Sequence, residues 1–355
     1  MELWQLFTAE EEYRASLKDR YGRAPYWASK NRTVFTPVIS EYLLQNGLRP
    51  HYPGNKKFAV CLTHDIDMLY NNISRKQLAK NGAKSLVTLN LQNLSKNLQA
   101  GLRKRINPHF HIAETLKIEK KYEAKSSSYF LSLSKEEEDF NYDLSEISEI
   151  FDAIAKSNGE VGLHGGHLAS NNISKIRQEK EKLEAAIGRS VDGYRSHYLK
   201  FNTPSTWEHL ETLNFKYDTT YGFADCAGFR NGMCHPFQPY SLEKKAFLNI
   251  VELPLVIMDN TLWKYMNLNE AGQFELCKQL IDTVARNNGV LTLLWHNTQM
   301  QGHPGLLYDA ILKYANEKEA WMTTGNEIVD FWKENKFHEV TKNIFEELKN
   351  NRLPV

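Results

Sequence analysis

The sequence predicts an α/β fold built on a mostly parallel sheet, and three observations lead to this prediction. The first is the continuous apolar run Phe58–Leu62, which is typical of a strand buried on both faces. The second is a regular alternation of strand-like and helix-like segments from residue 111 onward. The third is that acidic residues, histidines and an arginine directly follow several of these strands. Ligands collect at the carboxyl ends of parallel strands, so the third observation agrees with the first two.

Each predicted element carries a local signal. Several helices end before glycines, at Asn158-Gly159, Gly188 and Gly289, which are common C-terminal stop signals. Pro204 opens another helix at its tolerated first turn. The predicted strands cover residues 58–62, 127–131, 160–163, 191–194, 215–218 and 290–295. The predicted helices cover residues 113–122, 144–156, 173–187, 206–213 and 269–287.

We expect one main domain, residues 56–335, with attachments at both ends. Residues 1–55 combine a helical start with frequent turn signals, and we expect an N-terminal extension packed on the main domain. Residues 336–355 are expected to form a C-terminal helical tail. An insertion at about residues 70–108 follows the first strand.

Within the insertion, apolar residues recur at three- and four-residue spacing, which predicts an amphipathic helix near residues 84–106. The C-terminal end of this helix is basic, with Arg103, Lys104 and Arg105 in succession. The simpler interpretation is a helix that packs on the domain and exposes its charged face to water. The alternative is a helix that contacts a membrane surface or a partner protein.

The composition is that of an ordinary globular chain of 355 residues, 41% hydrophobic and 25% charged. A balance of 44 basic and 43 acidic residues gives a net charge of +1, which argues against a nucleic-acid partner. Four scattered cysteines without a C-x-x-C pair suit a reducing compartment. The first residues lack the features of a signal peptide, and no apolar run reaches the ~18 residues of a membrane span. We therefore expect a cytoplasmic location.

Two aspartates end the first strand. Alternation along an extended chain places Asp65 and Asp67 on the same side, about 7 Å apart by the strand rise. Such carboxylates repel each other unless a cation, a proton or an arginine lies between them. A solvated pair in a turn is the simpler interpretation, but residues of suitable chemistry follow the other strands, and we expect all of them to converge on one rim. These residues are His164, His167, Arg195, His197, Asp218 and His296.

One carboxylate and two imidazoles form a ligand set for a divalent metal, with zinc preferred and then cobalt, nickel or iron. Asp67, His164 and His167 offer such a set, because the glycines between the two histidines allow both rings to reach one ion. Neither a phosphate-binding glycine loop nor the G-x-S-x-G sequence of serine hydrolases occurs. The sequence therefore favours metal-assisted chemistry over nucleotide binding or serine catalysis.

The ordered motifs resemble those of polysaccharide deacetylases, the metal-dependent carbohydrate esterases that share a nodulation-deacetylase homology domain. These motifs are Thr63-His-Asp-Ile-Asp67, His164-Gly-Gly-His167, Gly193-Tyr-Arg-Ser-His-Tyr198 and Leu294-Trp-His296. The resemblance covers about residues 58–332. Upstream, residues 7–13 and 19–23 look like the leader that precedes this domain in a bacterial branch of the family. The resemblance implies a distorted (β/α)7-type barrel of about seven strands, with an N-terminal extension and a helical insertion after the first strand.

The resemblance also implies roles for the reacting groups. Asp65 would be the general base that takes a proton from water, and Asp67 and His164 would bind the metal. In the family the second histidine usually follows the first by four residues, and here Leu168 occupies that place. His167 is still the expected third ligand, and because of this departure His197, which stands where the family commonly has proline, is the reserve.

The remaining roles follow from the same resemblance. His296 would protonate the departing amine, and Arg195 would orient the general base while Asp218 holds its guanidinium. The backbone N–H of Tyr198 would donate to the oxyanion, and Trp295 would form a wall of the pocket.

From these observations we expect a hydrolase that removes acetyl from an N-acetylated sugar or saccharide with metal-activated water. One alternative is a deacylase of a small N-acyl or O-acetyl compound. Another is a catalytically inactive barrel that binds saccharide. The sequence does not fix the sugar or the oligomeric state.

Overall fold

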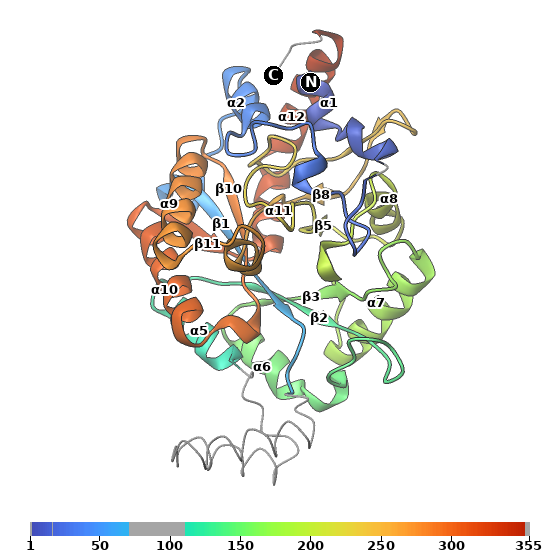
Figure 1. Cartoon of the computed structure of the whole chain (residues 1–355), viewed down its shortest axis with the longest axis vertical. Coiled ribbons are helices and arrows are strands. Elements are labelled where there is room, and N and C mark those ends of the chain that lie inside the picture. Colours follow the sequence, from blue (N-terminus) through green and yellow to red (C-terminus); the bar gives the residue numbers. More distant parts are fainter. Residues whose placement is uncertain (1, 16, 71–110, 352–355) are drawn as a thin grey trace.

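The computed structural model of the chain describes residues 2–15, 17–70 and 111–351. A parallel sheet forms its centre, and helices lie outside the sheet (Figure 1). Along the sheet the order is β8-β5-β4-β3-β2-β1-β10-β9, and β11 pairs with the first half of β1. The strands are β1 (Phe58–Ile66), β2 (Ser127–Leu131), β3 (Glu160–Gly165), β4 (Gly193–Ser196), β5 (Tyr217–Asp218), β8 (Val251–Glu252), β9 (Leu255–Met258), β10 (Val290–Leu294) and β11 (Ala320–Thr323).

The two edge strands of this sheet, β8 and β9, are consecutive in the chain. Leu253 and Pro254 separate them, and proline has no N–H to continue a ladder. The N–H of Leu253 still donates to the Asp218 carbonyl, and that of Leu255 donates to Tyr221. Counted as one interrupted strand, β8 and β9 join the two edges, so the sheet curls into a distorted barrel of seven strand positions with β11 beside it. This confirms the predicted fold class.

The helices begin and end at recognisable signals. Asn172, Asn269 and Thr324 cap three of them with side chains that accept a backbone N–H, and Gly188 ends the helix that Asn172 begins, with a φ of 72°. The predicted helices are present within about two residues at each end, except that residues 144–146 form a separate 3-10 turn. The α-helices are α1 (Leu3–Phe7), α2 (Val38–Gln45), α5 (Ile112–Lys120), α6 (Ser148–Lys156), α7 (Ile173–Ile187), α8 (Ser205–Thr212), α9 (Glu270–Arg286), α10 (Gly302–Glu317), α11 (Gly325–Glu334) and α12 (Phe337–Asn351).

Strand β1 is buried along its whole length, and its side chains alternate between two parts of the core. Phe58, Val60 and Leu62 pack in a cluster with apolar residues of α9 and α10. Ala59 and Cys61 pack instead with residues of β2, β5 and β8. A strand covered on both faces needs an uninterrupted apolar run, and this is the pattern that identified it in the sequence.

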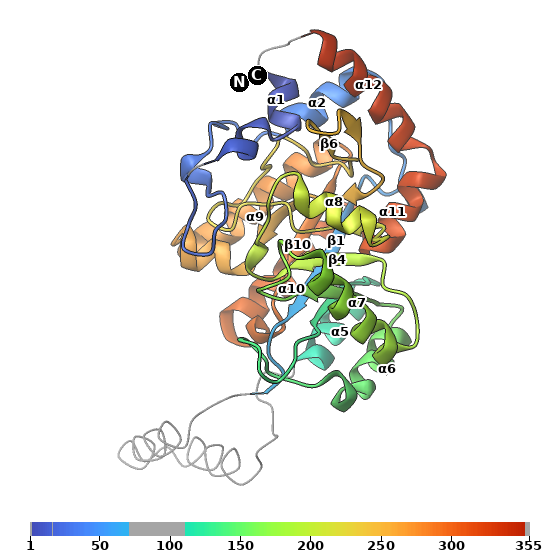
Figure 2. The same ribbon diagram turned by 90° about the vertical axis from the view of Figure 1, so that its right-hand side faces the viewer.

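The N-terminal extension lies against the C-terminal helix at one end of the molecule, where Figure 2 shows α1 and α2 beside α12. Phe7 stacks on Phe345 with ring centroids 3.7 Å apart. Farther along, Glu12 forms a buried ion pair with Arg230 at 2.7 Å. A short antiparallel hairpin, β6 (Tyr240–Ser241) with β7 (Ala246–Phe247), packs beside this region.

The insertion predicted at residues 70–108, with its helix at 84–106, lies almost wholly outside the described residues. Its proposed contact with a membrane surface therefore stays a prediction. Across residues 2–15, 17–70 and 111–351, no helix is both long enough and apolar enough to cross a bilayer.

Candidate metal centre and active site

Strand β1 delivers two aspartates to the same place. Asp65 is the next-to-last residue of the strand, and Asp67 is the first residue after it. Both contact His164, whose Nε2 lies 3.6 Å from Asp65 Oδ2 and 3.2 Å from Asp67 Oδ1. His64, which directly precedes Asp65 in the motif, points elsewhere, because its Nε2 lies 2.8 Å from buried Glu119. The alternation predicted from the sequence therefore separates a structural histidine from the pair of aspartates.

Three side chains form a group that could hold a metal ion: Asp67, His164 and His197. Asp67 Oδ1 lies 3.2 Å from His164 Nε2 and 3.5 Å from His197 Nδ1, and the two nitrogens lie 3.0 Å apart. Ligands of a tetrahedral zinc ion, each about 2.0–2.2 Å from it, would be roughly 3.3–3.5 Å from one another. The spacing of the three atoms therefore suits one small divalent cation.

The surroundings of these atoms also favour a cation. His164 Nδ1 lies 3.0 Å from the carbonyl of Arg195, which assigns the ring proton to Nδ1 and turns the lone pair of Nε2 toward the group. Asp67 Oδ1 is buried and has no hydrogen-bond donor among the described residues. Burial opposes ionisation, but the neighbouring histidines, His197 first, hold the pKa of Asp67 well below its ordinary value. An anionic oxygen without a donor beside two imidazole nitrogens fits a divalent metal.

Asp139 lies behind His197. The Oδ2 atom of Asp139 is 3.4 Å from His197 Nε2 and accepts a hydrogen bond of 3.0 Å from the hydroxyl of Tyr198. The hydrogen bond to His197 lowers the pKa of Asp139. A carboxylate behind a ligating histidine fixes the orientation and tautomer of the ring, so Asp139 has the place of an outer partner in a metal site.

His167, the expected third ligand, does not join this group. Its ring lies edge-on to Tyr198 with centroids 5.8 Å apart, and its carbonyl accepts a hydrogen bond from Lys200. The reserve candidate His197 takes the place beside Asp67 and His164. The reason is topological: His197 directly follows β4, which pairs with β3 and its residue His164, whereas His167 lies two residues beyond the end of β3.

Arg195 is fully buried next to Asp65, with Nη1 3.5 Å from Asp65 Oδ1. Two hydroxyls fix the guanidinium, because Nη2 donates to Thr63 and Nε donates to Thr219, each at 3.0 Å. The guanidinium therefore balances the negative charge that Asp65 carries in its buried position. This is the contact expected for the pair.

Asp218 does not hold the guanidinium directly. Its Oδ1 accepts from the backbone and hydroxyl of Thr220, and its side chain pairs with Glu252, its register partner on β8. Burial, together with the charge of Asp218, raises the pKa of Glu252 well above its ordinary value, and burial raises that of Asp218 too. Both carboxyls therefore favour the protonated form more than exposed carboxyls do. The neighbouring residue Thr219 makes the contact with Arg195 that was predicted for Asp218.

His296 also borders the group, with Nε2 3.6 Å from Asp67 Oδ2. Asp259, fully buried after β9, accepts from the backbone N–H of His296 and lies 2.7 Å from its Nδ1. Burial would lower the pKa of His296, but Asp259 and the two aspartates of β1 raise it to about 10. His296 is therefore held as a cation with Nε2 directed toward the group, which suits a proton donor.

Trp295 is not a wall of the pocket, and this prediction is corrected. The side chain is fully buried, packs against Trp263 and Tyr308, and donates its indole N–H to the carbonyl of Gln299. Residues next to each other at a strand end point to opposite sides, so a tryptophan beside a rim histidine enters the core.

The sequence did not single out three acidic residues of the site. Glu252 ends β8 and Asp259 follows β9, but an acidic residue at a strand end is usually solvated, and neither strand has the length that would have identified it. Asp139 lies in the irregular segment between β2 and α6, where no periodic signal exists. Only the fold brings Asp139 to His197.

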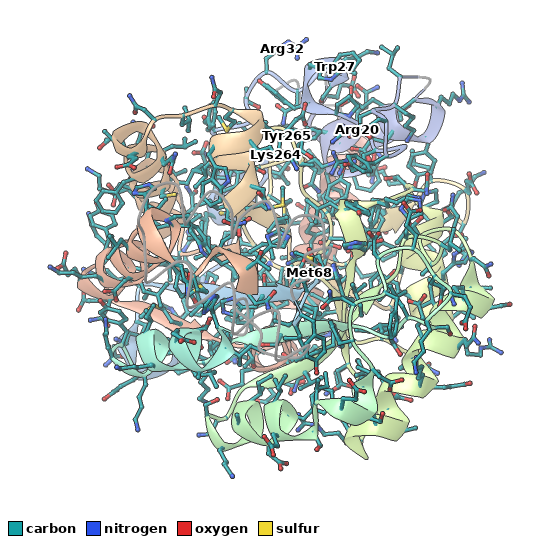
Figure 3. The ribbon with its side chains drawn as sticks, turned by 60° about the horizontal axis from the view of Figure 1, so that its bottom comes forward. Arg20, Trp27, Arg32, Met68, Lys264 and Tyr265 are labelled. Carbon is teal, nitrogen blue, oxygen red and sulfur yellow. The ribbon has the colours of Figure 1, made fainter. Side chains whose placement is uncertain are left out.

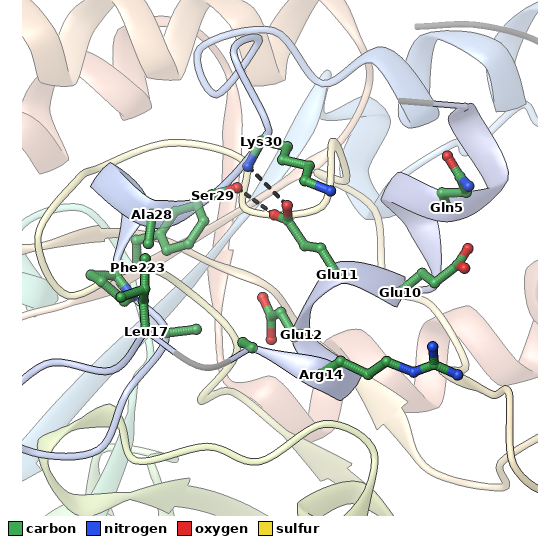
Figure 4. A pocket seen from close by; sticks show the side chains of 13 residues that line it. Gln5, Glu10, Glu11, Glu12, Arg14, Leu17, Ala28, Ser29, Lys30 and Phe223 are labelled. Carbon is green, nitrogen blue, oxygen red and sulfur yellow. Dashed lines mark hydrogen bonds between the residues drawn. The ribbon is translucent and has the colours of Figure 1, made fainter.

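A separate cavity of about 610 Å³ lies in the N-terminal extension (Figure 4). Glu11, on its wall, accepts hydrogen bonds from the hydroxyl of Ser29 and the N–H of Lys30. Glu12 lines it too and is paired with Arg230. None of the three residues of the metal group lines this cavity, so it belongs to the packing of the extension.

The fold and the site together define a curled parallel α/β barrel with an Asp-His-His group at the carboxyl ends of its strands. This is the arrangement expected of a metal-dependent hydrolase. No family model matches the sequence, and no curated protein matches it.

Solved structures identify the fold more closely. A protein from Mycobacterium smegmatis described as a polysaccharide deacetylase superposes with a TM-score of 0.54 at 16% identity, over 80% of this chain and 93% of that one. The Puue allantoinase gives 0.54 at 14%, over 82% and 96%. A protein from Pseudomonas aeruginosa PAO1 described as a polysaccharide deacetylase gives 0.53 at 13%, over 82% and 96%. The chain therefore has the polysaccharide deacetylase fold that its motifs predicted.

Proposed function

We propose that this protein is a metal-dependent hydrolase that removes acetyl from an N-acetylated sugar or saccharide. One observation carries the proposal: a candidate metal group lies between a carboxylate–arginine pair and a histidine–aspartate pair. Asp65 and Arg195 form the first pair, and His296 and Asp259 form the second. Amide hydrolysis needs a base for the attacking water and an acid for the leaving amine, so the two pairs match its two requirements.

Asp67, His164 and His197 would hold the metal, most suitably zinc given one carboxylate and two imidazoles. A divalent ion bound there would polarise the substrate carbonyl and lower the pKa of water toward ~7. Asp139 would keep the ring of His197 in the orientation that directs Nδ1 at the ion. Cobalt, nickel or iron would suit the same ligands.

Asp65 is the general base in this proposal. Its Oδ2 lies 3.6 Å from His164 Nε2, and it therefore stands next to the group that would hold the metal. Arg195 is anchored by two threonine hydroxyls and keeps its guanidinium against the other oxygen of Asp65. One oxygen of the carboxylate is thus positioned by the arginine, and the other remains to accept a proton from water.

His296 is the general acid. An amine is a poor leaving group unless it is protonated, and His296 presents a protonated Nε2 beside Asp67 of the metal group. Asp259 holds Nδ1 and the backbone of the same residue, so the ring keeps one orientation while Nε2 gives its proton to the departing nitrogen. The N–H of Tyr198 is the proposed donor to the oxyanion.

The substrate class is inferred from the polysaccharide deacetylases that share the fold. An acetate-release screen over N-acetylated monosaccharides, oligosaccharides and nucleotide-linked sugars tests it, with small N-acyl and O-acetyl compounds as the comparison set. The expected result is release from at least one sugar amide, abolished in Asp65→Asn, which is nearly isosteric and cannot act as the base. Acetate release from small N-acyl compounds alone would contradict a sugar substrate and support a deacylase of small N-acyl compounds.

A further inference from the structure

The N-terminal extension reaches the active site through a compact turn, residues 19–23. Asp19 closes this turn, because its Oδ1 accepts the N–H groups of Tyr21 and Arg23 and its Oδ2 accepts from Arg23 Nε at 2.7 Å. The backbone adds a bond from the N–H of Asp19 to the carbonyl of Arg23. The turn is therefore a pre-formed unit that carries a buried arginine and a tyrosine.

Arg23, whose Nη2 also lies 2.6 Å from Asp19 Oδ2, donates to residues of the main domain as well. Nη1 donates to the carbonyl of Tyr198 at 2.7 Å, and Nη2 donates to the hydroxyl of Tyr265 at 3.3 Å. The side chain of Tyr21 stacks on that of Tyr198 with centroids 4.8 Å apart and planes 17° apart. Figure 3 shows Arg20 of the turn and Tyr265 on the same face of the molecule. The turn thus holds Tyr198 by both its backbone and its ring.

The segment it holds is strained. Tyr198 has a φ of 59° and Leu199 a φ of 54°, so two consecutive residues with side chains adopt the left-handed conformation that glycine favours. Such conformations persist where surrounding contacts impose them, and they cluster at functional sites. The segment directly follows His197 of the candidate metal group, and the hydroxyl of Tyr198 is fixed by Asp139.

We propose that Arg23 is a positioning residue of the active site: by holding the Tyr198 carbonyl it fixes the strained turn that places the Tyr198 N–H and the ring of His197. The inference rests on the proposed function, in which that N–H donates to the oxyanion. A bond from a buried, charged donor to a backbone carbonyl is stronger than a neutral one, which suits the task of holding an unfavourable backbone conformation. The N-terminal extension then positions groups of the active site in addition to packing on the main domain.

The test compares two buried arginines that tie the extension to the main domain. Arg23→Met removes the donors to Tyr198, whereas Arg230→Met breaks the pair with Glu12 and leaves Tyr198 untouched. Asp19→Asn, a third variant, loosens the turn but leaves Arg23 able to donate. Steady-state kinetics on the N-acetylated substrate, zinc stoichiometry and the visible spectrum of the Co²⁺-loaded protein are measured for each.

Arg23→Met should lower kcat by about 10- to 100-fold with KM changed by less than about 3-fold, because displacement of an oxyanion donor costs transition-state stabilisation. Zinc stoichiometry should stay at the wild-type value, while the Co²⁺ bands shift because the ring of His197 moves. Arg230→Met should keep the wild-type kcat and Co²⁺ spectrum. Asp19→Asn should lose less activity than Arg23→Met. Arg23→Lys, which keeps a charged donor, should retain part of the activity that Arg23→Met loses.

Equal losses of kcat in Arg23→Met and Arg230→Met, or an unchanged kcat in Arg23→Met, would overturn the inference. If the wild-type protein releases no acetate from any substrate, the proposed function fails, and the Co²⁺ spectra then decide the inference alone. Identical spectra for the wild type and Arg23→Met would refute it in that case.

Discussion

Replacement of His296 by alanine is the sharpest test of which residue acts as general acid and which as general base. His296 lies 2.7 Å from Asp259 and carries a pKa raised to about 10. This raised pKa favours the protonated ring at neutral pH, so the acid is held in its active form and His296→Ala removes its whole contribution.

Loss of a general acid costs on the order of 10²- to 10⁴-fold in rate, and we expect about 10³-fold for an N-acetylated sugar. An activated ester such as nitrophenyl acetate expels an anion that needs no proton, so its hydrolysis should fall by less than about 10-fold. Asp65→Asn disables the attacking water and should damage both reactions alike. His303→Ala, a histidine hydrogen-bonded to Gln273 on α9, is the matched control and should leave both rates near the wild-type values.

The assay measures acetate from the amide and nitrophenolate from the ester on the same protein preparations. Equal losses on the two substrates in His296→Ala would refute the assignment and give His296 a binding or orienting role.

The pH dependence of kcat is a second test of the same assignment. Because the acid must be protonated, kcat should fall as pH rises through the pKa of His296, and Asp259→Asn should move this fall to lower pH by removing the neighbouring negative charge.

Three further predictions concern the metal group and the buried carboxyl pair. His197→Ala should lose zinc while His167→Ala keeps it, as measured by elemental analysis of protein purified without chelator; the reverse result would restore the ligand set expected from the sequence. Asp139→Asn should raise the zinc dissociation constant by about 10- to 100-fold in a competition titration, since it weakens the outer partner of His197. The pKa values of Asp218 and Glu252 are raised in the folded protein. The pair therefore contributes fully to the unfolding free energy below the ordinary carboxyl pKa, and this contribution is lost as pH rises through the raised pKa values. Urea unfolding from about pH 5 to 8 should therefore show less loss of stability with pH in Asp218→Asn, whose amide carries no charge beside Glu252, and an unchanged slope would contradict the pairing.

Long apolar strands and capped helices could be predicted from the sequence because their signals are local. The strand Ser127–Leu131 and the helix Ile173–Ile187 have the predicted bounds. The short strands β8 and β9 escaped prediction because two to four residues on either side of Pro254 give no periodic pattern. The helix α10 also went unpredicted, although residues 302–317 form it in the structure.

The residues of the candidate site likewise differ in whether a local signal in the sequence reveals them. Asp65, Asp67, His164 and His296 could be found because each lies at or just beyond the end of a strand that the sequence reveals, and parallel strands bring their carboxyl ends together. The choice between His167 and His197 depends on which turn carries its ring back toward β1, and that is set by the pairing of β3 with β4. Trp295 is a different kind of error. It was assigned to the pocket because it stands beside His296 in the motif, but alternation along the chain directs its side chain into the core.

The most direct test of the central claim is acetate release by chelator-treated protein as zinc is added back, with an N-acetylated sugar found in the screen as substrate. The structure predicts that activity disappears with the metal and returns to a plateau at about one equivalent of zinc, with no return in His164→Ala. Full activity after removal of the metal, or zinc binding at wild-type stoichiometry in His164→Ala, would contradict the assignment of Asp67, His164 and His197 as the metal centre.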